Sequence, residues 1–204
     1  NAAAYRAVYR NQMIAYGYRN TLIYRTRGTT LNYVMTALGG YAHSRKGLPG
    51  QKFIMLAIVF TMQFTGGMIP SFLLVFNLGI YDTIWAIVLP NAIATMNLII
   101  MRTAFASVPV ELEESARLDG ASDLTILFRI FIPVTKATAA VIIMFYAVGH
   151  WNDFFSGLIY LRNRLLHPLQ LVLREILIQE SLQESMGGIT TDRETIAENI
   201  KYAT

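Results

Sequence analysis

Apolar residues gather into four long windows along the chain, and short polar connections separate them. The windows cover residues 28–44, 53–76, 83–106 and 136–160, and each contains few charged side chains. A helix needs about 20 predominantly apolar residues to cross the hydrocarbon core of a bilayer. The pattern therefore predicts four membrane-spanning helices, with residues 16–22 as a candidate extension of the short first one.

The second window is interrupted in its middle by Gly66, Gly67 and Pro70. Glycine and proline kink or break a helix. A break inside a span is tolerated only where protein or a water-filled cavity satisfies the freed backbone groups. We therefore predict a hinge, or a break that lines a pore, at these three residues.

The connection 107–135 is long, polar at its start and divided by a glycine. Ser107 and Pro109 are typical of a helix start, and the three glutamates that follow favour the positive end of a helix. Gly120 is typical of a helix end, and Ser122 of a second helix start. The pattern predicts helix, glycine turn and helix. It fits an ordinary connector as well as a functional loop, although long ordered loops tend to be functional.

The segment 161–204 predicts an amphipathic helix that lies on a membrane surface or against a partner. Its apolar residues recur at helical spacing. They are Leu169, Val172, Leu173, Ile176 and Leu177. Further along, Thr191 and Glu194 have the spacing of a capping box that opens another helix.

The charges of the short connections predict an orientation. Residues 45–52 carry three positive charges and residues 77–83 carry none, and positively charged loops stay in the cytoplasm. Alternation then places 107–135 in the cytoplasm and both 1–27 and 161–204 outside. We interpret residues 1–27 as an interfacial segment, although their five arginines oppose the charge rule.

Composition supports a membrane protein. Of the 204 residues, 54% are hydrophobic and 15% are charged, whereas a soluble domain carries about 25% charged residues. The net charge of +4 does not predict a nucleic acid partner, because Lys and Arg mostly flank apolar segments. The absence of cysteine from the sequence excludes disulfides and thiolate metal sites.

The sequence lacks the motifs of a membrane enzyme. It contains no His-Glu-x-x-His, no Gly-x-Ser-x-Gly and no Walker A run. His43, His150 and His167 lie in different segments, so they predict no metal site. We expect a non-catalytic chain that binds no metal and no cofactor of its own.

One stretch of the long connection resembles the signature loop of permease subunits of bacterial ABC importers. The matching positions are Glu114, Ser115, Ala116, Gly120, Ile130, Ile132 and Pro133. The family pattern is Glu-Ala-Ala, three residues, Gly, nine residues, Ile, one residue, Leu-Pro. The chain departs from it at Ser115 and Ile132. The WND run at 151–153 and the PLQLVLREIL run resemble the carbohydrate-uptake branch, especially permeases for oligosaccharides and plant-polymer fragments.

The resemblance implies an all-α membrane protein with the type I ABC importer permease fold. A full subunit of this family has six spans, of which about four fall within this chain, with residues 28–160 as the permease core. The implied location is the bacterial inner membrane, with several passes through the bilayer. The implied partners are a second, homologous permease subunit, two cytoplasmic ATPase subunits that hold ATP and Mg²⁺, and an extracytoplasmic solute-binding protein. Residues 161–204 then lead toward a last span that follows this chain.

The resemblance also makes the connection 107–135 a coupling loop that docks on an ATPase subunit and transmits its motion. The candidate coupling residues are Glu114, Ser115, Ala116, Arg117, Leu118, Asp119, Gly120 and Ala121. Glu114 and Arg117 offer charged hydrogen bonds, and Ala116 and Gly120 allow close approach. Leu118, Leu124 and Phe128 offer apolar contacts.

Polar residues within the windows are candidates for a substrate path, because intramembrane polar groups face a bundle interior or a cavity. The polar candidates are Gln63, Asn91, Asn97, Asn152 and Asp153, with His150 beside them. Two interpretations stay open for each of these: a path residue, or an interhelical hydrogen bond worth about 0.6 kcal/mol. Trp151 is a further candidate with two open interpretations: stacking on a sugar face, or anchoring of the span near the outer interface. A permease for a non-sugar solute, a passive channel and a membrane enzyme are the alternative functions.

Overall fold

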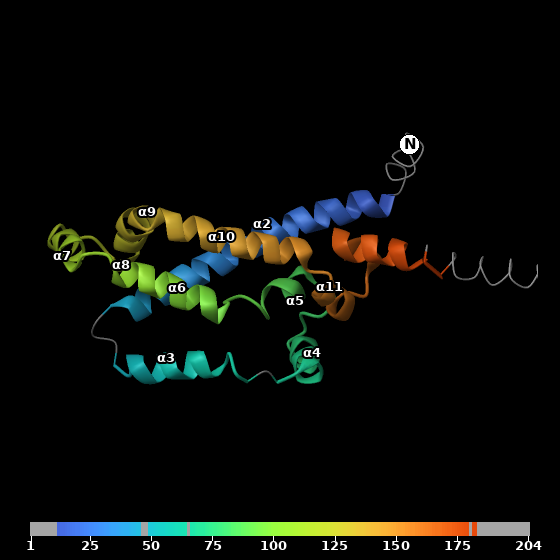
Figure 1. The fold of residues 1–204 in the computed structure, drawn as a ribbon, viewed down its shortest axis with the longest axis horizontal. Coiled ribbons are helices and arrows are strands. Elements are labelled where there is room, and N and C mark those ends of the chain that lie inside the picture. The colour runs from blue at the N-terminus through green and yellow to red at the C-terminus, as the bar shows by residue number, and fades with distance from the viewer. Residues whose placement is uncertain (1–11, 46–48, 65, 180, 183–204) are drawn as a thin grey trace, which may run out of the picture.

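The computed structural model describes residues 12–45, 49–64, 66–179 and 181–182, and every regular element among them is a helix (Figure 1). The elements are α2 Gln12–Ser44, α3 Gln51–Phe60, α4 Met68–Asn77, α5 Ile84–Val88, α6 Thr95–Ala106, α7 Val110–Leu118, α8 Asp123–Ile126, the π-helix η1 Leu127–Phe131, α9 Ile132–Val134, α10 Lys136–Asn152, α11 Phe155–Tyr160 and the 3-10 helix η2 Arg164–Leu166. A further helix covers residues 169–179. The predicted all-α fold is confirmed.

Helix α2 is longer than the first apolar window and runs for 33 residues. Its buried face is a stripe of mostly small and polar residues three or four apart, including Gly17, Thr21, Gly28, Asn32 and Thr36. Such a stripe packs closely against other helices but adds little to an apolar window. The boundary expected between residues 27 and 28 falls inside this helix, so no break in the backbone marks it, and the division into an interfacial segment and a membrane core stays a prediction.

Helices α2, α6 and α10 pack together at the centre of the structure (Figure 1). Gly40 brings α2 close to α6, since a β-carbon there would lie 3.0 Å from Cγ of Met101. Beside this crossing, the rings of Tyr41, Phe105 and Phe131 meet edge to face, with centroids 5.1 to 6.5 Å apart. These rings belong to the main apolar core, which extends under the connection 107–135.

The second window forms two helices, α3 and α4, which run in different directions (Figure 1). Gly67, immediately before α4, has a φ of 89°, in the region that favours glycine. Pro70 lies in the first turn of α4, where its missing N–H costs no helical bond. The predicted break is present, whereas motion about Gly66, Gly67 and Pro70 stays a prediction.

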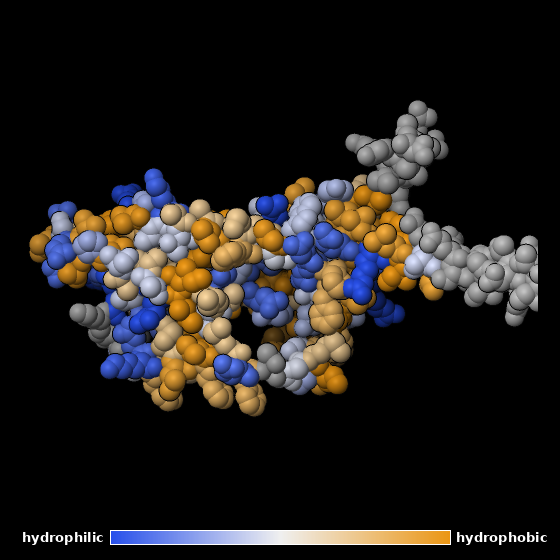
Figure 2. All heavy atoms as spheres, in the orientation of Figure 1, coloured by the Kyte–Doolittle hydropathy of each residue, from blue (hydrophilic) through white to orange (hydrophobic). Residues whose placement is uncertain are grey.

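Most side chains of α3 and α4 are exposed. No residue of α3 is buried, and Val75 is the one buried residue of α4. Figure 2 shows hydrophobic atoms along the lower edge, where Figure 1 places these two helices. This part of the described chain leaves its apolar side chains available to lipid or protein.

The third and fourth windows are also divided. Pro90 lies in the segment between α5 and α6. Asp153 separates α10 from α11, and its Oδ1 accepts the N–H of Ser156 at 3.0 Å. The expectation of one continuous helix per window is thus wrong for windows three and four, because Pro90 and a capping aspartate divide them.

Taken singly, no helix in the described part of the chain is both long and apolar enough to meet a membrane-span criterion. The segments Asp123–Val134 and Lys136–Asn152, joined at a bend of 92°, meet it together.

The helix over residues 169–179 packs against the first half of α2. Leu169 and Val172 are buried there beside Ile14, and Ile176 lies against the same cluster. Leu173 is 37% and Leu177 64% exposed, so only part of the predicted apolar face turns inward. The capping box predicted at Thr191 and Glu194 lies outside the described residues.

Polar side chains of α2 hold the segment that precedes this helix. Asn20 Nδ2 donates to the carbonyls of Leu165 and His167 at 2.6 and 3.2 Å. The hydroxyl of Thr21 accepts the N–H of Leu169 at 2.9 Å. These bonds satisfy polar groups that would otherwise be costly to bury.

Candidate coupling loop and polar hollow

The first helix of the connection, α7, begins after Pro109 and not at Ser107. Ser107 ends the preceding helix, because its hydroxyl donates to the carbonyl of Ala104 at 2.8 Å. The capping role predicted for Ser107 is therefore wrong. Helix α7 instead begins immediately after Pro109, whose ring restricts φ. Glu111 and Glu113 lie in the first turn of α7, where acidic side chains are favoured.

Gly120 ends α7 with a φ of 79°, which confirms the predicted turn. The N–H of Gly120 donates to the carbonyl of Arg117 at 3.0 Å, and that of Ala121 to the carbonyl of Ala116 at 2.9 Å. Together these bonds form a Schellman motif, which satisfies the last carbonyls of a helix. Ser122 then caps α8 as predicted, because its hydroxyl accepts an N–H from the first turn.

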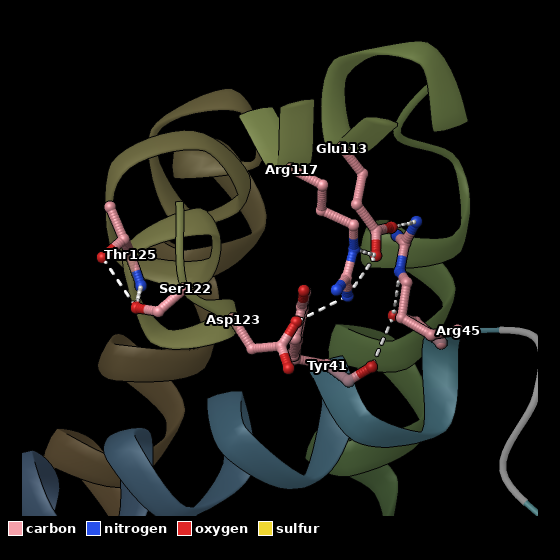
Figure 3. A network of polar contacts seen from close by, with 8 residues as sticks. Tyr41, Arg45, Glu113, Arg117, Ser122, Asp123 and Thr125 are labelled. Atoms are coloured by element: carbon pink, nitrogen blue, oxygen red, sulfur yellow. Dashed lines mark hydrogen bonds and ion pairs between the residues drawn. The ribbon is translucent and has the colours of Figure 1, made fainter. Parts of the chain in front are cut away.

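An ion-pair network centred on Glu113 joins α7 to the end of α2 (Figure 3). Arg45 Nη1 lies 2.8 Å from Oε2 of Glu113, and Arg117 Nη2 lies 3.0 Å from Oε1. Arg117 also contacts Asp123 at 2.5 Å. The hydrogen bond to Glu113 and the charge of Asp123 raise the pKa of Arg117, so its guanidinium stays charged at any physiological pH.

The candidate coupling residues divide between two faces of the loop. Ala116 is buried in the core of the chain itself, so its small size serves packing within this subunit and not approach to a partner. Leu118 is 89% exposed, and six more candidates are exposed or half-buried. They are Glu114, Ser115, Arg117, Asp119, Gly120 and Ala121. Leu124 and Phe128 add exposed apolar surface in the next helical segment.

A second candidate site is a polar hollow of about 440 Å³ between α2, α6, α10 and the segment before α6. Its lining residues are Asn32, Asn91, Ala94, Asn97, Phe145, Tyr146, Gly149, His150, Asn152, Asp153 and Ser156. The structure thus brings together four of the six predicted path residues, and His150 with them. Most of these lining residues carry an amide, hydroxyl or imidazole group, one carries a carboxylate, and none is Lys or Arg.

Two predicted path residues lie elsewhere. Gln63 is exposed in the turn after α3, and Trp151 points away from the hollow toward the first half of α2. The Trp151 ring meets Tyr18 edge to face at 6.4 Å, and the Arg25 guanidinium lies 5.7 Å from its centroid. Trp151 follows His150 by one position, which turns its side chain to another face of α10.

Hydrogen bonds from α2 organise the wall of the hollow. Asn32 Nδ2 donates to the carbonyl of Asn91 at 3.2 Å and lies 3.1 Å from Nε2 of His150. Gly28 makes room for this imidazole, since a β-carbon there would lie 2.5 Å from Nε2. Sequence reasoning missed Asn32, although its polarity within an apolar window was a usable signal.

Tyr146 makes a second connection across the hollow. Its hydroxyl lies 2.7 Å from Oγ1 of Thr36 and accepts the N–H of Ala94 at 3.0 Å. Tyr146 thereby links α10, α2 and the start of α6. Thr36 follows Asn32 by one helical turn, so both polar positions of α2 face the same wall.

The described residues contain no group of three His, Asp or Glu side chains placed to hold a metal ion. A second hollow, of about 470 Å³, lies beside the ion pairs of the connection and is lined by Arg45, Glu113, Glu114 and Arg117 among others. In neither hollow does a Ser or Tyr hydroxyl of the described residues form a hydrogen bond to a His, Asp or Glu side chain; the Tyr146 hydroxyl bonds to Thr36 and Ala94, and the Ser44 hydroxyl to Tyr41 and Arg45.

Comparison with known proteins identifies the family. A family model described as "Binding-protein-dependent transport system inner membrane component" matches residues 35–186, well over half of the chain. The chain belongs to this family. Its members are membrane permease subunits, which carry no catalytic centre of their own, and the recognition made from the glycine-divided loop is confirmed.

Individual relatives point the same way. The chain is 38% identical to the polygalacturonan/rhamnogalacturonan transport system permease protein YtcP of Bacillus subtilis (strain 168), over 98% of this chain and 70% of that protein. It is 39% identical to protein LplC of the same organism, over 86% of this chain and 60% of that protein. A crystal structure of a bacterial ABC transporter involved in the import of the acidic polysaccharide alginate matches with a TM-score of 0.82 and 35% identity. That match covers 84% of this chain and 61% of the other.

The chain therefore spans 60% to 70% of the length of these relatives. The shared fold and the family are shown by these matches.

Proposed function

We propose that this chain is the membrane-spanning part of an ATP-driven importer of carbohydrates, with oligosaccharides or fragments of plant polymers as substrates. The observation that carries this proposal is the likeness, over most of the chain, to a permease named for polygalacturonan and rhamnogalacturonan transport and to an ABC transporter involved in alginate import. The proposed setting is a bacterial inner membrane that the full subunit crosses several times.

The polar hollow is the proposed part of the substrate path. Carbohydrates are recognised through hydroxyl groups that both donate and accept hydrogen bonds, and side-chain amides do the same. Asn91, Asn97 and Asn152 offer such amides, and Asp153 adds an acceptor. Ring faces of Phe145 and Tyr146 offer apolar contact to sugar C–H groups.

The exposed face of the connection is the proposed dock for a cytoplasmic ATPase subunit, with ATP and Mg²⁺ held by two such subunits. Leu118 is its apolar centre, and Glu114 and Arg117 are charged groups at its edge, an arrangement that suits a protein interface. The wide apolar surface of α3 and α4 is proposed to contact lipid and a second, homologous permease subunit. Gly66, Gly67 and Pro70 form the proposed hinge between these two helices. An extracytoplasmic solute-binding protein delivers the substrate.

The test is uptake by the assembled complex, with its binding protein, in proteoliposomes that contain or lack internal ATP. Oligogalacturonides, neutral oligosaccharides, amino acids and phosphate are offered in parallel. The proposal expects saccharide uptake that requires ATP. Uptake without ATP would support a passive channel, and ATP-dependent uptake restricted to a non-sugar solute would overturn the carbohydrate assignment.

Glu114→Lys tests the coupling part of the proposal. The reversed charge at the exposed edge is expected to leave the complex assembled but to separate ATP hydrolysis from uptake. Glu111→Lys is the matched control, because it introduces the same charge into the same helix at a position outside the candidate coupling set. Normal substrate-stimulated ATPase activity in Glu114→Lys would exclude the proposed role of this face.

A further inference from the structure

Arg45, at the end of α2, contacts three other elements at once. Its Nη1 donates to Oε2 of Glu113 at 2.8 Å, and its Nη2 donates to the carbonyl of Phe105 at 2.5 Å. Its Nε donates to the hydroxyl of Ser44 at 3.1 Å. The guanidinium lies 4.2 Å from the centroid of the Phe131 ring. One side chain thus ties α2 to α6, α7 and η1.

Glu113 is the polar anchor of α7. It is 7% exposed, and each of its carboxylate oxygens accepts from an arginine. The other buried residue of α7 is Ala116, and the remaining side chains of this helix are exposed. A buried charge is costly without its partner, so the Arg45–Glu113 pair fixes where α7 sits relative to α2.

The same helix reaches both candidate sites. Arg45 follows Asn32 by 13 positions, which corresponds to about 20 Å along a helix axis at about 1.5 Å per residue. At the wall of the hollow, the Asn32 side chain of α2 bonds to the carbonyl of Asn91 and to His150. One turn further along α2, the Thr36 hydroxyl bonds to the hydroxyl of Tyr146. Helix α2 runs without a break from Asn32 to Ser44, the residue immediately before Arg45.

We propose that the Arg45–Glu113 pair is the joint through which the coupling loop moves α2 and so changes access to the polar hollow. The inference rests on the proposed function as an ATP-driven permease and adds a route within the subunit. An unbroken helix transmits displacement along its length, so motion of α7 carried to Arg45 reaches Asn32. Arg45 and Glu113 are positioning residues, because they touch neither the substrate nor the ATPase chemistry.

The joint can be tested without a transported substrate. The chain contains no cysteine, so Ser156→Cys places one reactive thiol in the wall of the hollow. Labelling of this thiol by a water-soluble maleimide, in the complete complex with and without ATP, reports access to the hollow. The variants Glu113→Gln, Arg45→Gln and the double variant are compared with Glu111→Gln, which makes the same chemical change at an exposed position of α7.

In the Ser156→Cys background and in Glu111→Gln, ATP is expected to change the labelling rate. In Glu113→Gln and in Arg45→Gln this ATP-dependent change falls roughly tenfold, the scale of losing a hydrogen bond to a charged group. The double variant is no worse than either single one, because both remove one joint and their effects do not add. Arg45→Lys keeps the charge but lacks the fork that reaches Glu113 and Phe105 together, so it restores only part of the change.

The outcomes separate the joint from the proposed function. If ATP does not change the labelling rate of the Ser156→Cys complex, the result argues against an ATP-driven permease, independently of the labelling rates of the other variants. ATP-dependent labelling that persists unchanged in assembled Glu113→Gln complex overturns the joint alone. Strictly additive effects of the two single variants overturn it too. If Glu113→Gln does not assemble, Arg45→Lys carries the same test, and an unchanged response there contradicts the proposal.

Discussion

The coupling loop and the polar hollow are built by different means, although one helix serves both. Consecutive residues with strong local preferences build the loop: a proline, a left-handed glycine and a capping serine within 14 positions, from Pro109 to Ser122. Residues from α2, α6 and α10 and from the segment before α6 build the hollow, which exists only once these helices pack. The loop is therefore sensitive to backbone geometry, and the hollow to the fit between helices.

The largest stability effect is expected from Gly28→Ala, at a residue that packs against His150 in the wall of the hollow. The added β-carbon would lie 2.5 Å from Nε2 of His150, and such overpacking costs about 1–3 kcal/mol. Gly149→Ala is the matched control, since nothing lies within 4 Å of its β-carbon and alanine favours a helix by up to about 1 kcal/mol. Thermal unfolding of the purified complex measures both. Equal melting temperatures would show that α2 and α10 are not closely fitted here.

Strain in the backbone conformation, without any steric clash, should be enough to impair the coupling loop. Gly120→Val forces a branched side chain into a φ of 79°, at a cost of about 1–2 kcal/mol, although no atom lies within 4 Å to clash. Gly79→Val imposes the same strain at a φ of 69° at the end of α4. Both variants should lose similar stability, but only Gly120→Val should lower uptake per ATP hydrolysed. A similar loss of uptake in Gly79→Val would remove the distinction between the two turns.

Asn32→Ala should loosen the hollow by about 1 kcal/mol, since two interhelical hydrogen bonds average about 0.6 kcal/mol each. The expected signs are a small drop in melting temperature and faster thiol labelling of Ser156→Cys, because the wall loses its bond to the carbonyl of Asn91. Asn97→Ala is the comparison, as another asparagine of the same wall. Identical labelling rates in Asn32→Ala and Asn97→Ala would show that Asn32 does not organise the wall of the hollow.

The smallest effect should come from the two serines of the loop. Ser122→Ala removes the cap of α8 and should cost about 0.5–1 kcal/mol. Ser107→Ala removes only a bond to the carbonyl of Ala104 within the last turn of α6, so its melting temperature should barely change. A larger drop in melting temperature for Ser107→Ala than for Ser122→Ala would support the capping role that the sequence position of Ser107 predicts.

The sequence predicts the loop better than the hollow because local preferences decide the loop. Gly120 and Ser122 behave as their residue types predict. Ser107 precedes Pro109 by two positions, so the sequence predicts that it begins a helix, whereas it ends α6. Polarity within apolar windows singles out Asn91, Asn97, Asn152 and Asp153, which all line the hollow, and their place in a substrate path stays a prediction. Their convergence, and the part played by Asn32, follow from packing that no single window contains.

The long first helix shows why some of the fold could not be predicted. Its inner stripe consists of Gly17, Thr21, Gly28 and similar residues, which bind neighbours by close approach and hydrogen bonds and not by apolar area. The first apolar window therefore begins at residue 28, whereas the helix begins 16 residues earlier, at residue 12. Glu113 was similarly underestimated, because its partner Arg45 lies 68 positions away.

The most direct test of the central claim, that the exposed face of α7 docks on an ATPase subunit, is site-directed cross-linking in the assembled complex. Leu118→Cys places a thiol at a position that is 89% exposed, and Ala116→Cys places one two residues away at a position that is 9% exposed. The account predicts that a short thiol-specific cross-linker joins position 118 to the ATPase subunit and leaves position 116 unlinked. Equal cross-linking at both positions, or none at position 118 in a complex that still hydrolyses ATP, would contradict it.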